Sequence, residues 1–484
     1  MTHVVILAVV FLAAASIMLF QFFRERRESA QFEPGYREFV KDPSLWDEMI
    51  NAHEEAAATV ADTSRWDEAQ IAEEVERYVF SPETKSDLWV LERQLIALSP
   101  KTNEALLGIL SDNANEARLK QLLPSDLLDD APVIRVCKLF DGNMPAEAIE
   151  LLTPYLSHES NKIRQACILA VAESGLPEAL PAIKRALADE DEYVRSFCLI
   201  GIKRAIESDK LSHEVGDGVI DDLDRLVTSD LNVEDSARLM AQIDPAHAQD
   251  FLLSEAVLHT DKRYLHEVLR VIGQFDFPIE RAKVKSLLDT YAGLEMKFPN
   301  TYVLGELLAL LGKFGDPDDE KTLEQFSNHE EEQVSYRAAQ GLIAFHNLEE
   351  FQDRIWEQEK NGGWDALSKE QQMYQSVFLL DAEVRNGGHS QYFFNSTGNN
   401  WQIALDGLIA MRLKEHREIF EDVIELFGDQ KPLTDRRKRQ DQLAAIFSEH
   451  ERAFNEFDSA YYEAKESVGV FLTRFVIQNA DKFQ

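Results

Sequence analysis

The sequence predicts an all-α protein with an N-terminal transmembrane helix, an α-solenoid of repeated helical hairpins and a C-terminal helical domain. Three observations lead to this prediction. An uncharged apolar run opens the chain, apolar positions in the middle recur after 31 residues, and the last quarter has helical periodicity interrupted by glycine and asparagine. The expected domains are the anchor at 4–23, an acidic spacer and helical region at 24–130, the solenoid at 131–355 and the C-terminal domain at 361–482.

Composition and charge restrict the classes of function. The chain has 484 residues, of which 45% are hydrophobic, so it can bury a large core. Its formal net charge of -37 argues against direct binding to nucleic acid or anionic lipid, because phosphate groups would repel the chain. The three cysteines, Cys137, Cys167 and Cys198, lack the spacing of a metal site and suit a reducing compartment.

The apolar run from Val4 to Phe23 is 20 residues long and carries no charge. A helix of this length spans about 30 Å, the thickness of a bilayer core. Arg24, Arg26 and Arg27 follow at once, and the positive-inside rule then places the rest of the chain in the cytoplasm. A cleaved signal peptide fits less well, because no basic residue precedes the run. We therefore expect a single-pass membrane protein.

The segment between the anchor and the solenoid is acidic and polar. Residues 24–60 are expected to serve in part as a spacer from the membrane. Helical apolar spacing begins after it, from Trp66 to Phe80 and from Leu88 to Leu98.

A repeated apolar pattern defines the solenoid. The residues Ile149, Leu152, Leu156, Ile163, Cys167, Ala170 and Val171 recur 31 positions later as Leu180, Ile183, Leu187, Val194, Cys198, Gly201 and Ile202. Both copies have a polar break between two helices and an arginine, Arg164 or Arg195, early in the second helix. Each unit is thus a helical hairpin whose apolar stripe must be buried by its neighbours.

A second pair of units is predicted further along, at 303–312 and 334–345. Gly341 takes the small position that Ala170 and Gly201 hold, where it allows the two helices of a hairpin to approach closely. The region between the pairs, about 210–300, keeps a helical pattern, but its repeat is degraded.

The segments IRQACILAVAESG at 163–175 and VRSFCLIGIKRA at 194–205 resemble HEAT-like repeats, in particular the short bacterial kind. The resemblance implies an α-solenoid with a curved surface that binds partner proteins. The family also includes repeats attached to enzymes.

The C-terminal domain begins after a change of pattern at 361–363. Ser368 and Gln371 have the spacing of a capping box, and a helix is expected from there to Val384. Asn386-Gly387-Gly388 is expected to end this helix, because glycine adopts the left-handed conformation without a clash. Further helices are expected at about 414–427, 436–447 and 466–479.

The segments DAEVRNGGHSQYFFNSTGN at 381–399 and FNEFDSAYYEA at 454–464 resemble the C-terminal domain of the DNA-mimic protein 19 family, a domain of unknown function. The resemblance implies an all-helical domain, common in bacteria, without established catalytic activity. One namesake member is an acidic, dimeric decoy for a transcription factor, so a homodimer is left open. Residues 361–484 contain 14 Lys and Arg against 20 Asp and Glu, which is only mildly acidic and argues against a mimic role for this domain.

The motif at 381–395 is the candidate site, either for partner binding or for the architecture of the domain. Asp381 and Glu383 point about 200° apart on a helix and cannot share a metal ion. Either carboxylate is expected to accept backbone amides of the turn at 387–391, and the aromatic residues to fill the core or a partner pocket. The candidate residues are Asp381, Glu383, Asn386, Gly387, Gly388, Ser390, Gln391, Tyr392, Phe393 and Asn395.

No nucleotide-binding, hydrolase or metalloprotease motif is present, so the sequence predicts neither an enzyme nor a bound cofactor or metal. The favoured function is a membrane-tethered scaffold or adaptor at the cytoplasmic face of a bacterial inner membrane, binding protein partners that the sequence does not identify. The alternative is an acidic decoy that sequesters a DNA-binding protein. An undescribed enzyme is the third.

Overall fold

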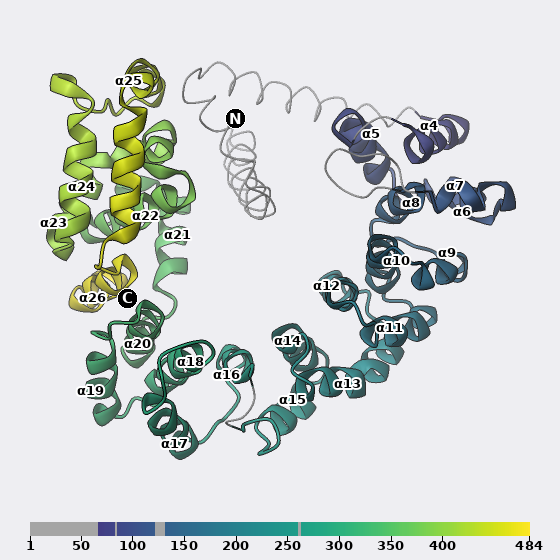
Figure 1. The fold of residues 1–484 in the computed structure, drawn as a ribbon, viewed down its shortest axis with the longest axis horizontal. Helices are drawn as coiled ribbons and strands as arrows, with labels where there is room; N and C mark the ends of the chain where they lie inside the picture. The colour runs from purple at the N-terminus through teal and green to yellow at the C-terminus, as the bar shows by residue number, and fades with distance from the viewer. Residues whose placement is uncertain (1–65, 83–84, 122–130, 260–262) are drawn as a thin grey trace. The chain divides into compact units, whose positions relative to one another are not determined.

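The computed structural model describes residues 66–484, except 83–84, 122–130 and 260–262. Within these residues the secondary structure is helical and contains no strand (Figure 1). The chain divides into two compact units, 66–341 and 342–484, and each is treated separately below. The all-helical architecture agrees with the predicted solenoid and helical domain.

The predicted transmembrane part of the fold is corrected. None of the described helices is long and apolar enough to cross a membrane. The expected anchor at 4–23 and the expected spacer at 24–60 lie outside the described residues. The described residues therefore contribute no transmembrane helix to the fold, and the predicted single-pass location in a bacterial inner membrane is withdrawn.

Helical hairpins stacked side by side form the unit 66–341. In each hairpin a first helix is followed by a second helix that packs on the second helix of the preceding hairpin. The unit begins with helices α4 to α8. In order, they occupy Glu68–Phe80, Lys85–Ala97, Asn103–Ser111, Glu116–Leu119 and Pro132–Phe140. Six hairpins follow, α9 with α10, α11 with α12, α13 with α14, α15 with α16, α17 with α18 and α19 with α20; α20 extends a few residues past the unit. Their bounds are Ala146–Leu152, Asn161–Glu173, Leu180–Leu187, Glu192–Glu207, His213–Thr228, Val233–Ile243, Pro245–Leu252, Leu265–Gln274, Arg281–Ala292, Asn300–Gly312, Pro317–Phe326 and Glu332–Phe345.

The stack is continuous through the region where the sequence repeat is degraded. Helices α13 to α17 form regular hairpins there, and in Figure 1 α12, α14, α16 and α18 lie along one side of the stack. Side chains such as Leu223, Ala237 and Leu269 are fully buried between them. The fold tolerates a loss of sequence repetition here, because stacking requires only an apolar stripe on each helix.

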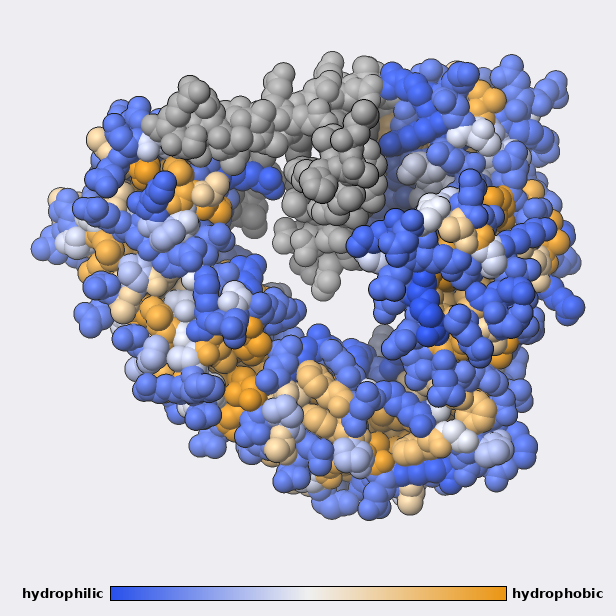
Figure 2. Space-filling model, turned by 180° about the vertical axis from the view of Figure 1, so that it is seen from behind, coloured by the Kyte–Doolittle hydropathy of each residue, from blue (hydrophilic) through white to orange (hydrophobic). Residues whose placement is uncertain are grey.

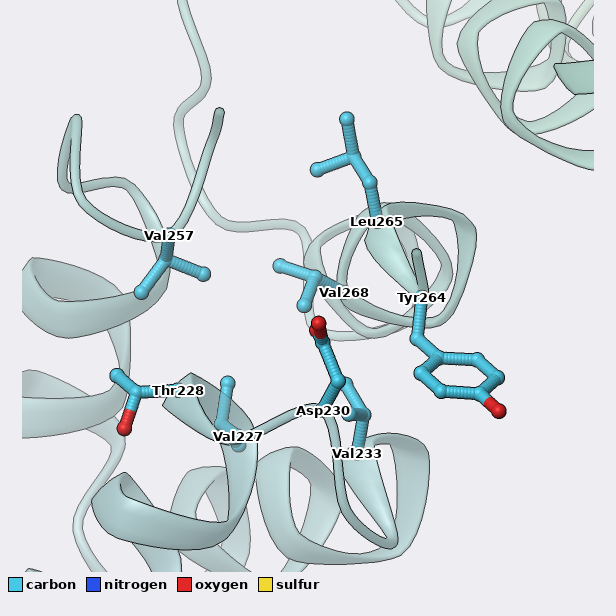
Figure 3. Close-up of a pocket in the computed structure, with 8 residues that line it drawn as sticks. All are labelled: Val227, Thr228, Asp230, Val233, Val257, Tyr264, Leu265 and Val268. Atoms are coloured by element: carbon cyan, nitrogen blue, oxygen red, sulfur yellow. The ribbon is translucent and has the colours of Figure 1, made fainter. Parts of the chain in front are cut away.

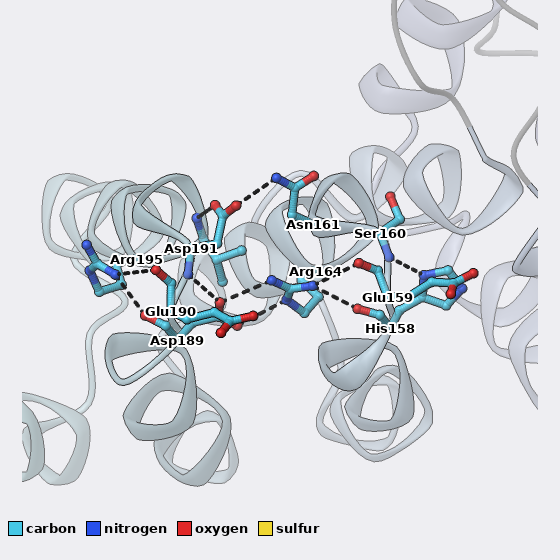
Figure 4. Close-up of polar contacts among 10 residues, drawn as sticks. His158, Glu159, Ser160, Asn161, Arg164, Asp189, Glu190, Asp191 and Arg195 are labelled. Atoms are coloured by element: carbon cyan, nitrogen blue, oxygen red, sulfur yellow. Dashed lines mark hydrogen bonds and ion pairs between the residues drawn. The ribbon is translucent and has the colours of Figure 1, made fainter.

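The repeated arginine closes the turn inside its own hairpin (Figure 4). Arg164 donates to the carbonyl oxygens of His158 at 2.9 Å and Glu159 at 3.2 Å. Arg195 donates in the same way to Asp189 and Glu190, at 2.8 and 3.2 Å. These arginines therefore satisfy carbonyl groups that the turn leaves without helical partners.

Each turn arginine also reaches the next hairpin. The guanidinium of Arg164 binds the carboxylate of Asp189, with an Nε–Oδ2 distance of 3.0 Å. Arg195 donates through Nε to Asn232 at 2.9 Å. One side chain thus fixes both the turn of its own hairpin and the position of the following one.

The small positions act between successive hairpins as well as within one, which extends the predicted role. A Cβ atom on Gly201 of α12 would lie 2.8 Å from the carbonyl oxygen of Leu169 on α10. Gly312 and Gly341, on α18 and α20, have their backbones in direct contact, and a Cβ on Gly312 would overlap the carbonyl oxygen of Gly341. Small residues therefore allow neighbouring second helices to approach, in addition to any role within a hairpin.

The unit 342–484 is a helical domain with its own aromatic core. Its core residues include Val377, Phe393, Phe420, Phe454 and Val476, all nearly inaccessible to solvent. Its α-helices are α21 to α27, at Phe351–Gly362, Lys369–Phe394, Trp401–Met411, Lys414–Glu425, Arg436–Glu463, Val468–Gln478 and Ala480–Phe483.

Two helices of this domain differ from their predicted lengths. α22 begins with the predicted capping box, in which Gln371 N–H donates to Ser368 Oγ at 3.2 Å and Gln371 Oε1 accepts from Ser368 N–H at 2.8 Å. Its backbone leaves the helical conformation at Gly387 and Gly388, as predicted, but a second helical segment follows directly and continues to Phe394. α25 runs to Glu463 rather than to 447, because Phe454 and Tyr461 keep burying one of its faces.

Candidate functional site

The kink in α22 is built around the carboxylate of Asp458, a residue of α25. Gly388 has φ of +82° and ψ of 176°, a conformation that is essentially restricted to glycine. A Cβ atom on Gly388 would overlap the Asp458 carboxylate. The backbone N–H of His389 donates to Asp458 Oδ1 at 2.8 Å. Asp458 therefore caps the second half of α22 from another helix.

Two tyrosines of α25 complete this joint. The hydroxyl of Tyr462 donates at 2.7 Å to the carbonyl oxygen of Val384, near the end of the first half of α22. The hydroxyl of Tyr461 donates to Asp381 Oδ1 at 3.1 Å, and Asp381 also binds Arg385. The two recognisable segments of the domain, 381–399 and 454–464, thus fold against each other.

Glu383 holds a separate polar cluster. Its carboxylate accepts from Gln391 Nε2 at 2.6 Å, Asn395 Nδ2 at 3.0 Å and Thr397 Oγ1 at 3.4 Å. Burial raises the pKa of Glu383, and these three hydrogen bonds oppose the increase. Glu383 therefore fixes the second half of α22 to the turn that follows it.

The predicted roles within the motif are partly corrected by these contacts. Neither Asp381 nor Glu383 accepts the backbone amide of the turn, since Asp458 does so, whereas Gln391 and Asn395 donate to the Glu383 carboxylate. The left-handed residue is Gly388, and Asn386 lies exposed before it. The spacing of the motif could not reveal Asp458, which lies 69 residues from His389 along the chain.

Most of the motif lies inside the domain. Tyr392, Phe393 and Phe394 have no exposed surface, and Ser390 and Gln391 are less than 10% exposed. The aromatic residues therefore pack in the core. A direct contact of this motif with a partner stays a prediction.

Arg439 is a buried residue that the sequence analysis missed within a run of basic residues. Its guanidinium donates to the carbonyl oxygens of Phe393 at 2.7 Å, Leu433 at 2.7 Å and Asn395 at 2.8 Å. Burial lowers its pKa to about 10. Its spacing from the start of the helix could have indicated this role. Arg439 stands four residues after the N-cap residue Asp435, just as Arg195 stands four residues after the N-cap residue Asp191.

Three exposed aromatic residues of the other unit, on adjacent hairpins, make up a more accessible candidate site. Phe298 is 48% exposed, Tyr302 37% and Tyr336 39%. The rings of Phe298 and Tyr302 contact each other, with centroids 5.7 Å apart, and both contact the ring of His266. Tyr302 and Tyr336 belong to the neighbouring second helices α18 and α20. We call Phe298, Tyr302 and Tyr336 the aromatic surface.

A ladder of ion pairs runs beside the aromatic surface, across four successive second helices. Arg270 of α16 binds Glu234 of α14 at 2.7 Å and Glu306 of α18 at 3.0 Å. Glu306 also binds Arg337 of α20 and is only 2% exposed. Arg238 pairs with Glu234 at 2.5 Å. The ladder neutralises these charges and fixes the relative positions of the helices that present the aromatic residues.

Carboxylates on the first helices, or just after them, are also paired in several places. Arg281 binds the fully buried Asp319 through two 2.7 Å hydrogen bonds. Lys184 lies 3.6 Å from Asp222 and Lys283 lies 3.0 Å from Glu255, each across adjacent hairpins. Part of the negative charge is therefore used to hold hairpins together.

One pocket opens between α13, α14 and α16, with an empty volume of about 220 Å³ (Figure 3). Five of its lining side chains are at most 3% exposed, so the pocket is too closed to enclose a small-molecule ligand. In the described ranges no three His, Cys, Asp or Glu side chains are arranged to hold a metal ion.

Comparison with protein families agrees with both resemblances seen in the sequence. A model of HEAT repeats matches residues 119–202, and a model of DMP19-like protein matches residues 365–479. None of the curated proteins matches the chain. The chain therefore contains HEAT repeats and, C-terminal to them, a DMP19-like domain.

Proposed function

We propose that the protein is a scaffold or adaptor that binds a partner protein through the aromatic surface of its helical repeats. The observation that supports this most strongly is the exposure of Phe298, Tyr302 and Tyr336 on neighbouring hairpins. Aromatic residues and arginine are enriched at the centre of protein interfaces. HEAT repeats are consistent with this function, because they are interaction modules in kind.

The surroundings of the aromatic surface favour an interface. The arginines beside it are already paired with Glu234 and Glu306. A partner that covers these arginines would therefore not bury an unpaired charge. The paired second helices also hold the rings in fixed positions, which reduces the entropy lost on binding. In Figure 2, which shows the chain from behind, hydrophobic residues reach the surface in separate patches among hydrophilic ones. Such a distribution suits specific contacts better than general adhesion.

In this proposal the motif at 381–395 is architectural. Its polar groups bind one another or α25, and its aromatic rings are buried. It supports the DMP19-like domain as a rigid module.

The test is capture of partners in living cells with the full chain and two variants. The double variant Tyr302→Ala/Tyr336→Ala removes the aromatic surface from two hairpins. The matched control is Tyr193→Ala, which removes a tyrosine that is 63% exposed on α12. We expect crosslinked proteins that are recovered with the wild type and with Tyr193→Ala but lost with the double variant. Equal recovery with all three chains would contradict the proposal.

A second candidate is an acidic decoy for a DNA-binding protein. The DMP19-like match and the net charge of -37 favour it. Binding to such a partner depends on charge and should weaken steeply as salt is added. Binding through aromatic contacts should change little. Titration of the captured partner at low and high ionic strength separates the two candidates.

A further inference from the structure

Arg263, which lies just before α16, is an exposed cation at the edge of the aromatic surface. Its guanidinium stands over the ring of Phe298, 5.8 Å from the centroid, and over the ring of Tyr264, at 5.1 Å. Both rings contact His266, which is 6% exposed and also contacts Tyr302. Such cation–π contacts hold a guanidinium in place and leave its N–H groups able to donate to another group. Arg263 thus adds a positioned positive charge to the aromatic surface.

Three carboxylates near these rings are already used within the chain. Glu306 is bound by two arginines of the ladder, and Glu295 lies 2.5 Å from Lys297. The carboxylate of Glu267 accepts a backbone N–H at 2.9 Å. By contrast, in the part of the chain that the structure describes, no carboxylate pairs with Arg263.

The start of α18 adds to the positive character of this region. Phe298 precedes the helix by two residues, and Tyr302 lies in its first turn. The helix has no side-chain cap and no acidic residue in that turn, so the partial positive charge of its N-terminus is not offset there. At physiological salt, charges more than about 8 Å away are largely screened. The aromatic surface is therefore complementary to an anionic group, although the chain as a whole is acidic.

A partner that covers the ring of Phe298 also covers the guanidinium that stands over it. Burial of an unpaired charge opposes binding, and a carboxylate on the partner removes this penalty by accepting the N–H groups of Arg263. Interfaces that combine arginine with aromatic residues are often centres of binding energy.

We propose that the aromatic surface binds a segment of a partner protein in which an aspartate or glutamate lies beside an apolar residue. The carboxylate pairs with Arg263, and the apolar side chain packs on Phe298 and Tyr302. This inference rests on the proposed function and adds the chemistry of the bound segment. The segment is opposite in charge to the DNA-binding protein that a decoy would sequester.

The test uses a library of random linear peptides displayed on phage and selected on the full chain. We expect the selected peptides to share an aspartate or glutamate next to an apolar residue. A synthetic peptide with that consensus, and a second peptide with the acidic residue replaced by its amide, are then titrated by fluorescence anisotropy. The amide peptide should bind the wild type about two- to fivefold more weakly, as for the loss of an exposed ion pair. Arg263→Gln should bind both peptides equally, because the pair is already broken.

Charge reversal and a matched control sharpen this test. Arg263→Glu should bind the acidic peptide more weakly than Arg263→Gln does, and should bind a peptide with lysine at the acidic position more tightly than the wild type does. The control is Arg185→Gln, which removes an exposed arginine on α11 and should leave the affinity unchanged.

The absence of a consensus, a consensus without an acidic residue, or equal affinity of the acidic and amide peptides for the wild type would overturn the inference. A peptide that loses binding to Tyr302→Ala/Tyr336→Ala but binds Arg263→Gln like the wild type would leave the proposed function standing and remove this one.

Discussion

At the scale of single residues, the DMP19-like domain depends on pairs that are distant in sequence. Gly388 is required because the Asp458 carboxylate occupies the space that a side chain would fill. The sequence indicated that the glycines interrupt a helix, because glycine adopts the left-handed conformation without a clash. It could not indicate that the carboxylate comes from α25, because only the tertiary fold brings Asp458 to the kink.

Substitution of Gly388 by alanine tests this pairing. We expect Gly388→Ala to destabilise the domain by about 1–3 kcal/mol, from the strained backbone and the loss of the Asp458 cap. Gly428→Ala is the control, since Gly428 also has a positive φ but has open space around its Cβ position. Hydrogen exchange of the amides at 385–394 should accelerate in the first variant alone. Equal exchange in both variants would show that Asp458 does not support the kink.

Two buried histidines should make stability depend on pH. Burial lowers the pKa of His266 from 6.5 to about 4, and burial also lowers the pKa of His416. Because the folded state binds the proton less tightly, the contribution of both histidines is complete above pH 6.5 and is lost as the pH falls below it, toward 4 in the case of His266.

Urea unfolding at a series of pH values measures this effect. For each histidine, the free energy of unfolding should fall by at most about 1.4 kcal/mol per pH unit as the pH decreases below 6.5. His266→Gln should flatten the dependence for its unit, and the exposed His213→Gln should leave it unchanged. An unaltered slope in His266→Gln would contradict the assignment.

At the scale of elements, the hairpins were predictable where both the apolar stripe and the polar turn recur. The spacing of Arg164 and Arg195 marked two turns, and the structure explains that spacing by the carbonyl groups they bind. Arg439, four residues after the N-cap residue Asp435, closes a turn in the other unit in the same way, where the sequence indicated only the start of a helix. Gly341 packs against Leu323 within its own hairpin, as predicted, and also against α18 of the preceding hairpin, which periodicity did not indicate.

Removal of a turn arginine should weaken its hairpin. Arg195→Ala leaves the carbonyl groups of Asp189 and Glu190 and the amide of Asn232 without this donor. We expect a loss of about 1–3 kcal/mol in the free energy of unfolding of the repeat unit. Arg185→Ala, an exposed arginine on α11, should cost much less. Urea denaturation followed by circular dichroism compares the two, and similar midpoints would refute a structural role for Arg195.

At the scale of the whole molecule, the sequence indicated a repeat stack and a separate helical domain, and both family matches agree. It did not indicate the aromatic surface or the pocket. Exposure of Phe298, Tyr302 and Tyr336 is a property of the packed stack, since aromatic residues in a helical pattern are expected to be buried. The transmembrane prediction came from an apolar run outside the described residues, and no described helix supports a membrane span.

The central claim is that the repeats bind a protein through the aromatic surface rather than through charge. The most direct measurement is the affinity of the captured partner for the wild-type chain and for Tyr302→Ala/Tyr336→Ala, at low and high salt. We predict a loss of at least tenfold in the variant, as for interface hot spots, and a weak dependence on salt for the wild type. An unchanged affinity in the variant, together with a steep loss in high salt, would contradict the claim and favour a decoy.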